Sequence, residues 1–232
     1  MEWRFRKFLV FFLIISLYFV IAYKRKNPWM TPLMPIRFVE QIIDGRPIVI
    51  KSTRVPIESM SPSILYAVMA AEDQKFISHF GFDFDALKSA FIYNIKHKTL
   101  SIWGSTITQQ TAKNLFLWQG RSIIRKGIEA YFTVLIELLR SKERILEVYL
   151  NIIEFGDGIY GIDQAAHIYF KTTPDKLSNY QSATLAAMLT NPRYYQDHLR
   201  SYVLSNRRSV INGGMSRLKR QSEFKTFIEK TR

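Results

Sequence analysis

The sequence has no cysteine and only four histidines among its 232 residues. Without cysteine the chain can form neither disulfide bonds nor thiolate zinc sites, which fits an oxidising compartment. The histidines are scattered along the chain, without the spacing of metal ligands: His79, His97, His167 and His198. Residue spacing therefore predicts no metal site.

Acidic residues are also scarce. The chain has 19 aspartates and glutamates against 33 lysines and arginines, for a formal net charge of +14. A surplus of this size implies an anionic partner, which could be nucleic acid, anionic lipid or a phosphorylated substrate. Nucleic acid is the poorest of these, because the membrane span predicted over residues 8–23 would place the rest of the chain outside the cytoplasm. We therefore expect phosphate groups at a membrane surface and no nucleic-acid partner.

Only one stretch is apolar enough to predict a membrane span. Residues 8–23 (FLVFFLIISLYFVIAY) carry no charge and would form a helix roughly 24 Å long, against about 30 Å for a hydrocarbon core. Flanking aromatic and basic side chains can make up the difference. A cleaved signal peptide is the alternative, but residues 24–26 (KRK) stand where a small-x-small cleavage site is expected. We predict an uncleaved single-pass anchor.

This anchor sets the expected organisation of the chain. Basic residues flank it on both sides, but the short leading tail and long trailing domain favour a cytoplasmic tail over residues 1–7. Residues 24–54 form a proline-punctuated connector, in which residues 47–50 are the plausible strand. From Ser61 onward the pattern is helical nearly to the end. Residues 55–232 are therefore predicted to form a mainly α domain.

Four helices can be placed from apolar periodicity and boundary residues. Ser61 supplies an N-cap and Pro62 the first helical residue of a helix that leads to Glu72. The other three are expected over residues 123–139, 142–153 and 180–189.

Residues 156–161 (GDGIYG) match the glycine fingerprint of dinucleotide-binding folds literally. That fingerprint requires a preceding strand and a following helix within a βαβ unit. Here a helix is expected before the glycines, and no parallel-sheet pattern is found in the sequence. We interpret the segment as a tight turn between helices that uses glycine's freedom at positive φ.

Glu72 is a candidate for proton transfer. It lies four residues after Val68 and three after Met69, so it continues the apolar stripe of its helix. Partial desolvation and the negative end of the helix dipole both raise the pKa of a carboxylate placed there. A raised pKa suits proton transfer near neutral pH. From the spacing alone, an ordinary charged residue at a fraying helix end is an equally good interpretation.

A run of hydroxyl and amide side chains follows at residues 104–110 (GSTITQQ). It could bind sugar hydroxyls or phosphate oxygens, or form a solvated turn that leads into a helix. The densest basic group outside the anchor flanks comes next: Lys113, Arg121, Arg125 and Lys126. Such a mixture of lysine and arginine is typical of pyrophosphate sites, and it is also compatible with a surface that faces anionic lipid.

Glu129 lies four residues after Arg125 on one face of a predicted helix. This spacing favours a surface ion pair, in the less favourable order with arginine first. From spacing alone, a role in chemistry is the weaker interpretation.

Taken in order, these segments resemble the glycosyltransferase family 51 module of peptidoglycan synthases, over about residues 55–195. The EDQKF of residues 72–76, followed by HFGFD, is similar to the first family motif. The other four motifs correspond to residues 104–116, 125–129, 142–170 and 185–192. Five motifs in the family's order are far more specific than any one of them.

The chain departs from the family pattern at Trp103, where a second glycine is usual, and at Gln181, where glutamate is frequent. Neither departure touches the carboxylates, so we expect them to change only local loop shape. No Ser-x-x-Lys transpeptidase signature follows the fifth motif. The resemblance is therefore to the monofunctional branch, and residues 114–118 (NLFLW) with 154–158 (EFGDG) are similar to its Gram-negative form.

The resemblance implies a lysozyme-like large lobe and a smaller, membrane-associated jaw lobe over roughly residues 84–120. It also implies an inner-membrane protein with its catalytic domain in the periplasm. Lipid II and the growing glycan strand would be its substrates. Inner-membrane lipid and other cell-wall synthesis proteins are the further partners that it implies.

On this resemblance, Glu72 is the general base for the acceptor's 4-hydroxyl. That oxygen attacks the donor's anomeric carbon with inversion and expels undecaprenyl pyrophosphate. Lys113 and Arg121 match positions that hold the pyrophosphate. Glu129 matches a second carboxylate, assigned to positioning or to a divalent cation such as Mg²⁺ or Mn²⁺, although no cofactor is required by the pattern. Weaker candidates for donor contacts are Ser105 and Gln109.

Two other functions stay open at this point. A lysozyme-like enzyme that cleaves glycan strands would also use one buried glutamate, but as an acid and without a pyrophosphate site. The basic group that contains Lys113, Arg121 and Arg125 argues against it. A non-catalytic scaffold for wall assembly would tolerate the loss of Glu72.

Overall fold

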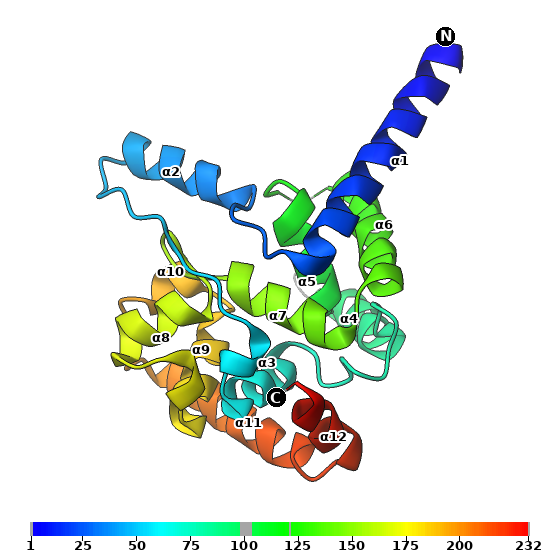
Figure 1. Ribbon diagram of the computed structural model, residues 1–232. Coiled ribbons are helices and arrows are strands. Elements are labelled where there is room, and N and C mark those ends of the chain that lie inside the picture. The colour runs from blue at the N-terminus through cyan, green and yellow to red at the C-terminus, as the bar shows by residue number, and fades with distance from the viewer. Residues whose placement is uncertain (1, 98–103, 121, 232) are drawn as a thin grey trace.

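A computed structural model of the protein describes residues 2–97, 104–120 and 122–231. This part of the chain is mainly helical, as predicted (Figure 1). The helices that the candidate site and its supporting core use are α3 (Pro62–Glu72), α5 (Ile107–Phe116), α6 (Ile123–Leu139), α7 (Lys142–Ile152), α8 (Ile162–Phe170), α9 (Asn179–Met188) and α11 (Tyr202–Leu218). The others are α1 (Glu2–Arg25), α2 (Leu33–Ile43), α4 (Phe84–Lys96), α10 (Pro192–Tyr195) and α12 (Ser222–Lys230). Short 3₁₀ turns form at η1 (Ile57–Ser59) and η2 (Pro174–Lys176).

Helix α3 lies at the centre of the main body and packs against α9 and α11. Its residues 64–70 are all buried, because a helix that is apolar all round must be enclosed. The hydroxyl of Ser61 caps it by accepting a hydrogen bond from the Ile64 amide at 3.3 Å, and Pro62 begins the helix, as predicted. This packing fixes the last residue of α3, Glu72, at the edge of the core.

The expected boundaries of the other helices are confirmed to within one residue. Helix α6 covers the predicted range 123–139, whereas α7 ends at Ile152 and α9 spans Asn179–Met188. Serine side chains cap all three at Ser122, Ser141 and Ser178, which is the boundary signal expected of helix N-termini.

The connector contains a helix that was not predicted. Helix α2 begins at Leu33 and has Pro35 in its first turn, where a missing amide hydrogen costs nothing. The proline pattern of residues 24–54 predicts a connector, and it did not indicate that part of this connector is helical.

The strand expected over residues 47–50 is also wrong. The Val49 amide donates to Oε1 of Gln41 at 2.8 Å and its carbonyl accepts from Nε2 of Gln41 at 3.2 Å, so a side chain takes the backbone bonds of this residue. Pairing begins later in the chain, where β1 (Lys51–Ser52) runs parallel to β3 (Ile159–Tyr160). Strand β2 (Glu154–Gly156) pairs antiparallel with β3 on its other side. Strands this short show too little alternation to be recognised in a sequence.

The GDGIYG segment lies between α7 and α8, as expected, but it forms the turn of the β2–β3 hairpin and includes strand residues, so it is not a simple turn between helices. Gly158 and Gly161 have φ angles of 73° and 83°, in the region that glycine adopts without strain. A Cβ at Gly158 would lie 1.6 Å from the Val49 carbonyl oxygen. The β2–β3 turn and the connector therefore pack backbone against backbone at this glycine.

We expect Gly158→Ala to lower the free energy of unfolding by about 2–4 kcal/mol. The new side chain must hold a positive φ and displace the backbone of the connector. Thermal or denaturant unfolding in detergent measures the change. Gly127→Ala is the matched control, since nothing lies within 4 Å of its Cβ and alanine favours the interior of α6 by about 0.5–1 kcal/mol. Equal stability of Gly158→Ala and wild type would contradict this contact.

Helix α1 projects from the main body and packs its second half against α6 (Figure 1). The hydroxyls of Ser16 and Tyr131 lie 2.7 Å apart, and Arg140 donates to the Val20 carbonyl at 3.2 Å. Within the described ranges, no helix is both long enough and apolar enough to cross a membrane. The predicted anchor over residues 8–23 is therefore not confirmed.

The jaw lobe expected over residues 84–120 is not confirmed as a unit. Helix α4 exposes large apolar side chains such as Phe84 and Phe91. Helix α5, in contrast, is buried against α6 and α7 in the main body. Residues 98–103, which include Trp103, lie outside the described part of the chain.

Candidate active site

The side chain of Glu72 reaches from the end of α3 to α5. Its Oε2 accepts a hydrogen bond from Nε2 of Gln110 at 2.8 Å, and its Oε1 is buried without a partner among the described residues. Burial raises the pKa of the Glu72 carboxyl, while the Gln110 hydrogen bond and the charges of Arg207 and Lys113 oppose that rise. The direction agrees with the predicted shift. This is not the environment of a solvated residue at a fraying helix end.

Two contacts hold α5 in register with Glu72. The hydroxyl of Tyr149, on α7, donates to Oε1 of Gln110 at 3.1 Å, which fixes the orientation of the amide. The carboxylate of Asp73 accepts from the Ile107 amide at 3.1 Å and lies 2.9 Å from Nε2 of His79. The start of α5 is therefore tied to the end of α3, one residue from the candidate base.

The basic group surrounds Glu129, which is buried on α6. Nη1 of Arg125 lies 3.0 Å from Oε2 of Glu129, and the Lys126 ammonium pairs with the other carboxylate oxygen. Lys126 also donates to the Ser105 hydroxyl at 3.3 Å. The predicted Arg125–Glu129 ion pair is confirmed, but its expected position at the surface is wrong, because α6 packs this face against α5.

Lys113 joins this group from α5. Burial lowers the pKa of its ammonium; Glu129 raises it again, and the nearby charges of Arg125 and Lys126 lower it further. The structure thus brings Lys113 within electrostatic range of both carboxylates, Glu72 and Glu129. A partly desolvated cation in this position attracts an anionic ligand more strongly than it would in water.

A cavity of about 180 Å³ lies between the end of α3 and the start of α5. Glu72 and Asp73 form one wall, and Ser105 and Thr106 form another. Through Ser105, which accepts from Lys126, the cavity adjoins the basic group. The candidate base therefore lines a hollow in the surface that adjoins the group of cations.

Other predicted site residues are placed differently. The side chain of Gln109 is buried, and its Oε1 accepts from the Thr106 amide at 3.0 Å in a capping box at the start of α5. Its role in donor binding stays a prediction, as does that of Ser105. Arg121 lies outside the described residues.

Sequence reasoning missed the residues that orient the side chain of the candidate base, Gln110 and Tyr149. Gln110 could have been found, because it lies three residues before Lys113 and so shares its face of α5. Tyr149 carried no such signal. In the sequence, Tyr149 looks like an ordinary buried aromatic residue of α7.

The residues around Glu129 do not fit a resident divalent cation. In the part of the chain that the structure describes, no group of three carboxylate or histidine side chains could hold a metal ion. Both carboxylate oxygens of Glu129 are paired with cationic side chains, Arg125 and Lys126. We therefore derive no step through a metal ion.

Comparison with known proteins defines the class of this enzyme. The family model described as transglycosylase matches residues 42–216, so the chain belongs to the transglycosylase family. It is 46% identical over 212 residues to the biosynthetic peptidoglycan transglycosylase of Bdellovibrio bacteriovorus, covering 91% of this chain and 84% of that protein. Proteins of the same name in Pseudomonas syringae and Bacteroides thetaiotaomicron are each 45% identical. These matches cover 93% and 89% of this chain, and 91% and 83% of the relatives. The family predicted from the motifs is confirmed.

Proposed function

We propose that this enzyme polymerises the glycan strands of bacterial peptidoglycan, with lipid II as its donor substrate. The names of its relatives support peptidoglycan as the product. The observation that carries the proposal is the proximity of a partly desolvated carboxylate, Glu72, to the cation Lys113, which lies near Arg125 and Lys126. Glu72 lines a cavity together with Ser105, the hydroxyl of which accepts from Lys126. The carboxylate can take a proton, and the cations can stabilise a departing pyrophosphate.

In the proposed reaction, Glu72 removes the proton from the 4-hydroxyl of the acceptor's N-acetylglucosamine. The oxygen forms a bond to the anomeric carbon of the donor's N-acetylmuramic acid as the bond from that carbon to the pyrophosphate breaks. Attack from the opposite side inverts the anomeric centre. Lys113 and Arg121, with Arg125 and Lys126, stabilise the charge that develops on undecaprenyl pyrophosphate.

In this scheme Glu129 is a positioning residue. Its ion pairs hold Arg125 and Lys126 on the side of α6 that meets α5. An arginine and a lysine fixed in this way are preorganised for an anion and need little rearrangement when it binds.

We also infer that the enzyme works at the inner membrane, with its catalytic domain in the periplasm. Helix α1 exposes large apolar residues such as Phe11, Ile14 and Ile21. A second cavity of about 280 Å³, lined almost wholly by apolar side chains, lies between α1, α5 and α6. It gives part of a polyprenyl chain room between α1 and the helices α5 and α6, which carry the basic group.

The test is to incubate purified protein with lipid II in detergent and to separate the products by size. Long glycan strands are the expected result. Shortening of preformed strands would instead indicate a glycan-cleaving enzyme. No product of either kind from a folded protein would indicate a scaffold.

We expect kcat/KM to depend on pH as a bell-shaped curve. Glu72 accepts a proton only when ionised, so activity should fall as pH drops through its pKa, which lies above the ordinary value of 4.5. Lys113 stabilises the leaving group only when charged, so activity should fall as pH rises through a pKa below the ordinary 10.5.

Gln110→Ala should move the acidic limb of this curve to higher pH. The Gln110 hydrogen bond stabilises ionised Glu72, so its loss raises the pKa of this carboxyl further. The alkaline limb should stay in place. Gln164→Ala is the control, because its amide bonds Thr53 instead. An unmoved acidic limb would contradict the role of Gln110.

A further inference from the structure

Helix α2 turns an apolar face outward. The exposed fractions of its side chains are 42% for Phe38, 50% for Val39, 52% for Ile42 and 76% for Ile43. Phe38 and Ile42 are four positions apart, Val39 and Ile43 likewise, and Val39 and Ile42 are three apart, so these residues share one side of the helix. A surface helix in water presents its polar side to the solvent, and α2 does the opposite.

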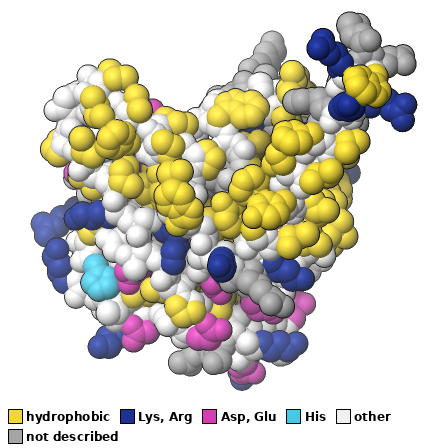
Figure 2. Space-filling model, turned by 45° about the horizontal axis from the view of Figure 1, so that its top comes forward, with side chains coloured by type: hydrophobic (Ala, Val, Ile, Leu, Met, Phe, Trp, Pro, Cys, Tyr) yellow, Lys and Arg dark blue, Asp and Glu magenta, His cyan; other side chains and the backbone are white. Residues whose placement is uncertain are grey.

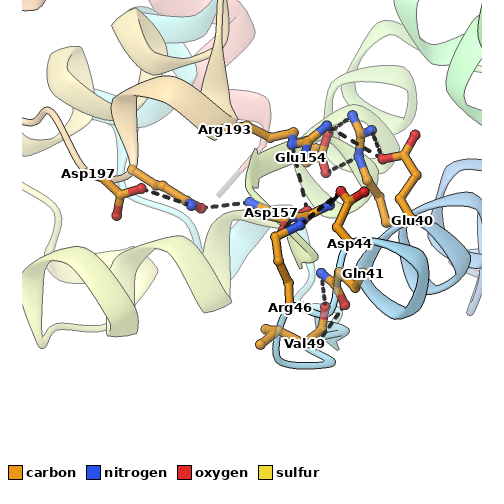
Figure 3. A network of polar contacts seen from close by, with 11 residues as sticks. Glu40, Gln41, Asp44, Arg46, Val49, Glu154, Asp157, Arg193 and Asp197 are labelled. Atoms are coloured by element: carbon orange, nitrogen blue, oxygen red, sulfur yellow. Dashed lines mark hydrogen bonds and ion pairs between the residues drawn. The ribbon is translucent and has the colours of Figure 1, made fainter.

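The polar side chains of α2 point into the protein instead. Gln41 is buried and makes its two hydrogen bonds to the Val49 backbone (Figure 3). Arg37 forms a two-point contact with Glu154, from Nε to Oε1 at 2.8 Å and from Nη2 to Oε2 at 3.0 Å. Its Nη1 donates to Glu40 at 2.6 Å. The polarity of this helix is therefore inverted relative to that of a solvated one.

Further contacts fasten α2 in this orientation. Leu33 and Met34 pack against Tyr160 of β3. The Arg46 guanidinium, just after the helix, pairs with Asp157, and Nη1 of Arg193 on α10 lies 3.5 Å from Glu40 (Figure 3). Rotating the apolar face inward would break the partly buried Arg37–Glu154 pair and leave a charge without its partner, which is costly. The outward face is thus part of the folded structure.

We propose that α2 is an interfacial helix, which lies in the surface of the bilayer with Phe38, Val39, Ile42 and Ile43 among the lipids. The apolar face of an interfacial helix lies at the boundary between headgroups and acyl chains, and the exposed face of α2 is apolar. The proposal rests on the inferred membrane location of the enzyme and adds a second, separate contact to that of α1.

Lipid fits this face better than another protein because of what surrounds it. Exposed apolar side chains gather over α2 and over α1 on the same side of the molecule (Figure 2). The exposed residues Trp29 and Met30 extend the patch into the connector, and Lys24 and Lys26 are exposed beside it. Tryptophan and lysine are the residues that concentrate at lipid headgroups.

The two helices run in different directions (Figure 1). One contact with a membrane leaves a domain free to rock about it. Two contacts along different axes fix the tilt of the domain, and with it the height of the Glu72 cavity above the lipid. A lipid-linked substrate then meets the cations at a constant depth.

Because the chain has no cysteine, a single introduced thiol can be labelled uniquely. The experiment places a fluorophore at Ile42→Cys in the full chain, reconstituted in vesicles of phosphatidylethanolamine and phosphatidylglycerol that carry nitroxide lipids. Leu17→Cys on α1 and Val210→Cys, 71% exposed on α11, are the comparison sites. We expect nitroxides near the headgroups to quench the Ile42 label several-fold more than they quench the Val210 label. Nitroxides deep in the acyl chains should quench the Leu17 label more than the Ile42 label.

Quenching at Ile42 no greater than at Val210 would overturn the proposal. So would a depth equal to that of Leu17, which would place α2 inside the hydrocarbon. If the label were shielded from lipid more strongly as the number of protein molecules per vesicle rises, a second copy of the chain would cover this face. That result would also overturn the proposal.

Lipid II polymerisation in the same vesicles distinguishes failure of the interfacial-helix proposal from failure of the proposed function. Polymer with an unquenched label contradicts only the interfacial helix, and a quenched label without polymer contradicts only the proposed function.

A double substitution tests the consequence for activity. Phe38→Glu with Ile42→Glu should lower polymerisation in vesicles about tenfold, which corresponds to about 1.4 kcal/mol, and leave the rate in detergent unchanged. Val210→Glu on α11 controls for added charge. Equal rates of the double variant and wild type in vesicles would contradict the role of this face.

Discussion

Glu72→Gln will abolish glycan polymerisation, with an expected loss of about 10²–10⁴ or more in kcat. Glutamine has nearly the same shape as glutamate and can still accept the Gln110 hydrogen bond at its amide oxygen. It cannot take a proton from the acceptor hydroxyl. The rate of lipid II consumption and the size of the products measure the loss.

Binding of lipid II separates a chemical defect from a structural one. We expect Glu72→Gln to bind the donor about as well as wild type, because the cations on α5 and α6 are unchanged. Glu223→Gln, an exposed glutamate on α12, should have normal activity. Turnover by Glu72→Gln at a rate near that of wild type would remove Glu72 from the role of base.

Lys113→Ala should lower kcat/KM for lipid II by about 10²–10³, the range found when one stabilising group is removed from a site of developing charge. Lys113 is partly desolvated and faces Glu129 and Glu72, so its charge is poorly screened. The loss should appear in chemistry as well as in donor binding, since charge on the pyrophosphate grows as the glycosidic bond breaks.

The unfolding temperature of Lys113→Ala shows whether a loss of activity comes from a loss of folded protein. Burying an ammonium costs free energy, so alanine at position 113 should not lower the unfolding temperature. Lys225→Ala on α12, where lysine is exposed, should change neither activity nor stability. A Lys113→Ala rate equal to that of wild type would exclude Lys113 from the pyrophosphate site.

The helices were predictable where one local signal determined them. Helix α6 shows a clear apolar stripe and a serine cap, and its range 123–139 followed from these alone. Helix α2 has the opposite pattern, with its polar groups inside and prolines before and within its first turn. The rules that place polar residues in water therefore did not apply to it. The strands β1, β2 and β3 depend on pairing across the chain, which short segments do not encode.

In the candidate site, too, features set by a single helix were predictable, and contacts between helices were not. Glu72 could be singled out because its position on an apolar stripe is a property of one helix. Its contact with Gln110 depends on how α3 meets α5, and no spacing within either helix specifies that. Glu129 was expected at the surface because the Arg125–Glu129 spacing does not reveal that α5 covers this face of α6.

The tie between Asp73 and the start of α5 has a consequence for inhibitor design. Gln110 and Lys113 lie three residues apart on α5, about 4.5 Å along its axis. The helix cannot slide relative to Glu72 while Asp73 holds the Ile107 amide. A rigid molecule with a hydrogen-bonding group and an anionic group at that spacing would match a fixed template. A substitution that moved only Gln110 or only Lys113 relative to the inhibitor would have to break helix α5. We therefore expect substitutions that confer resistance to arise in the walls of the cavity.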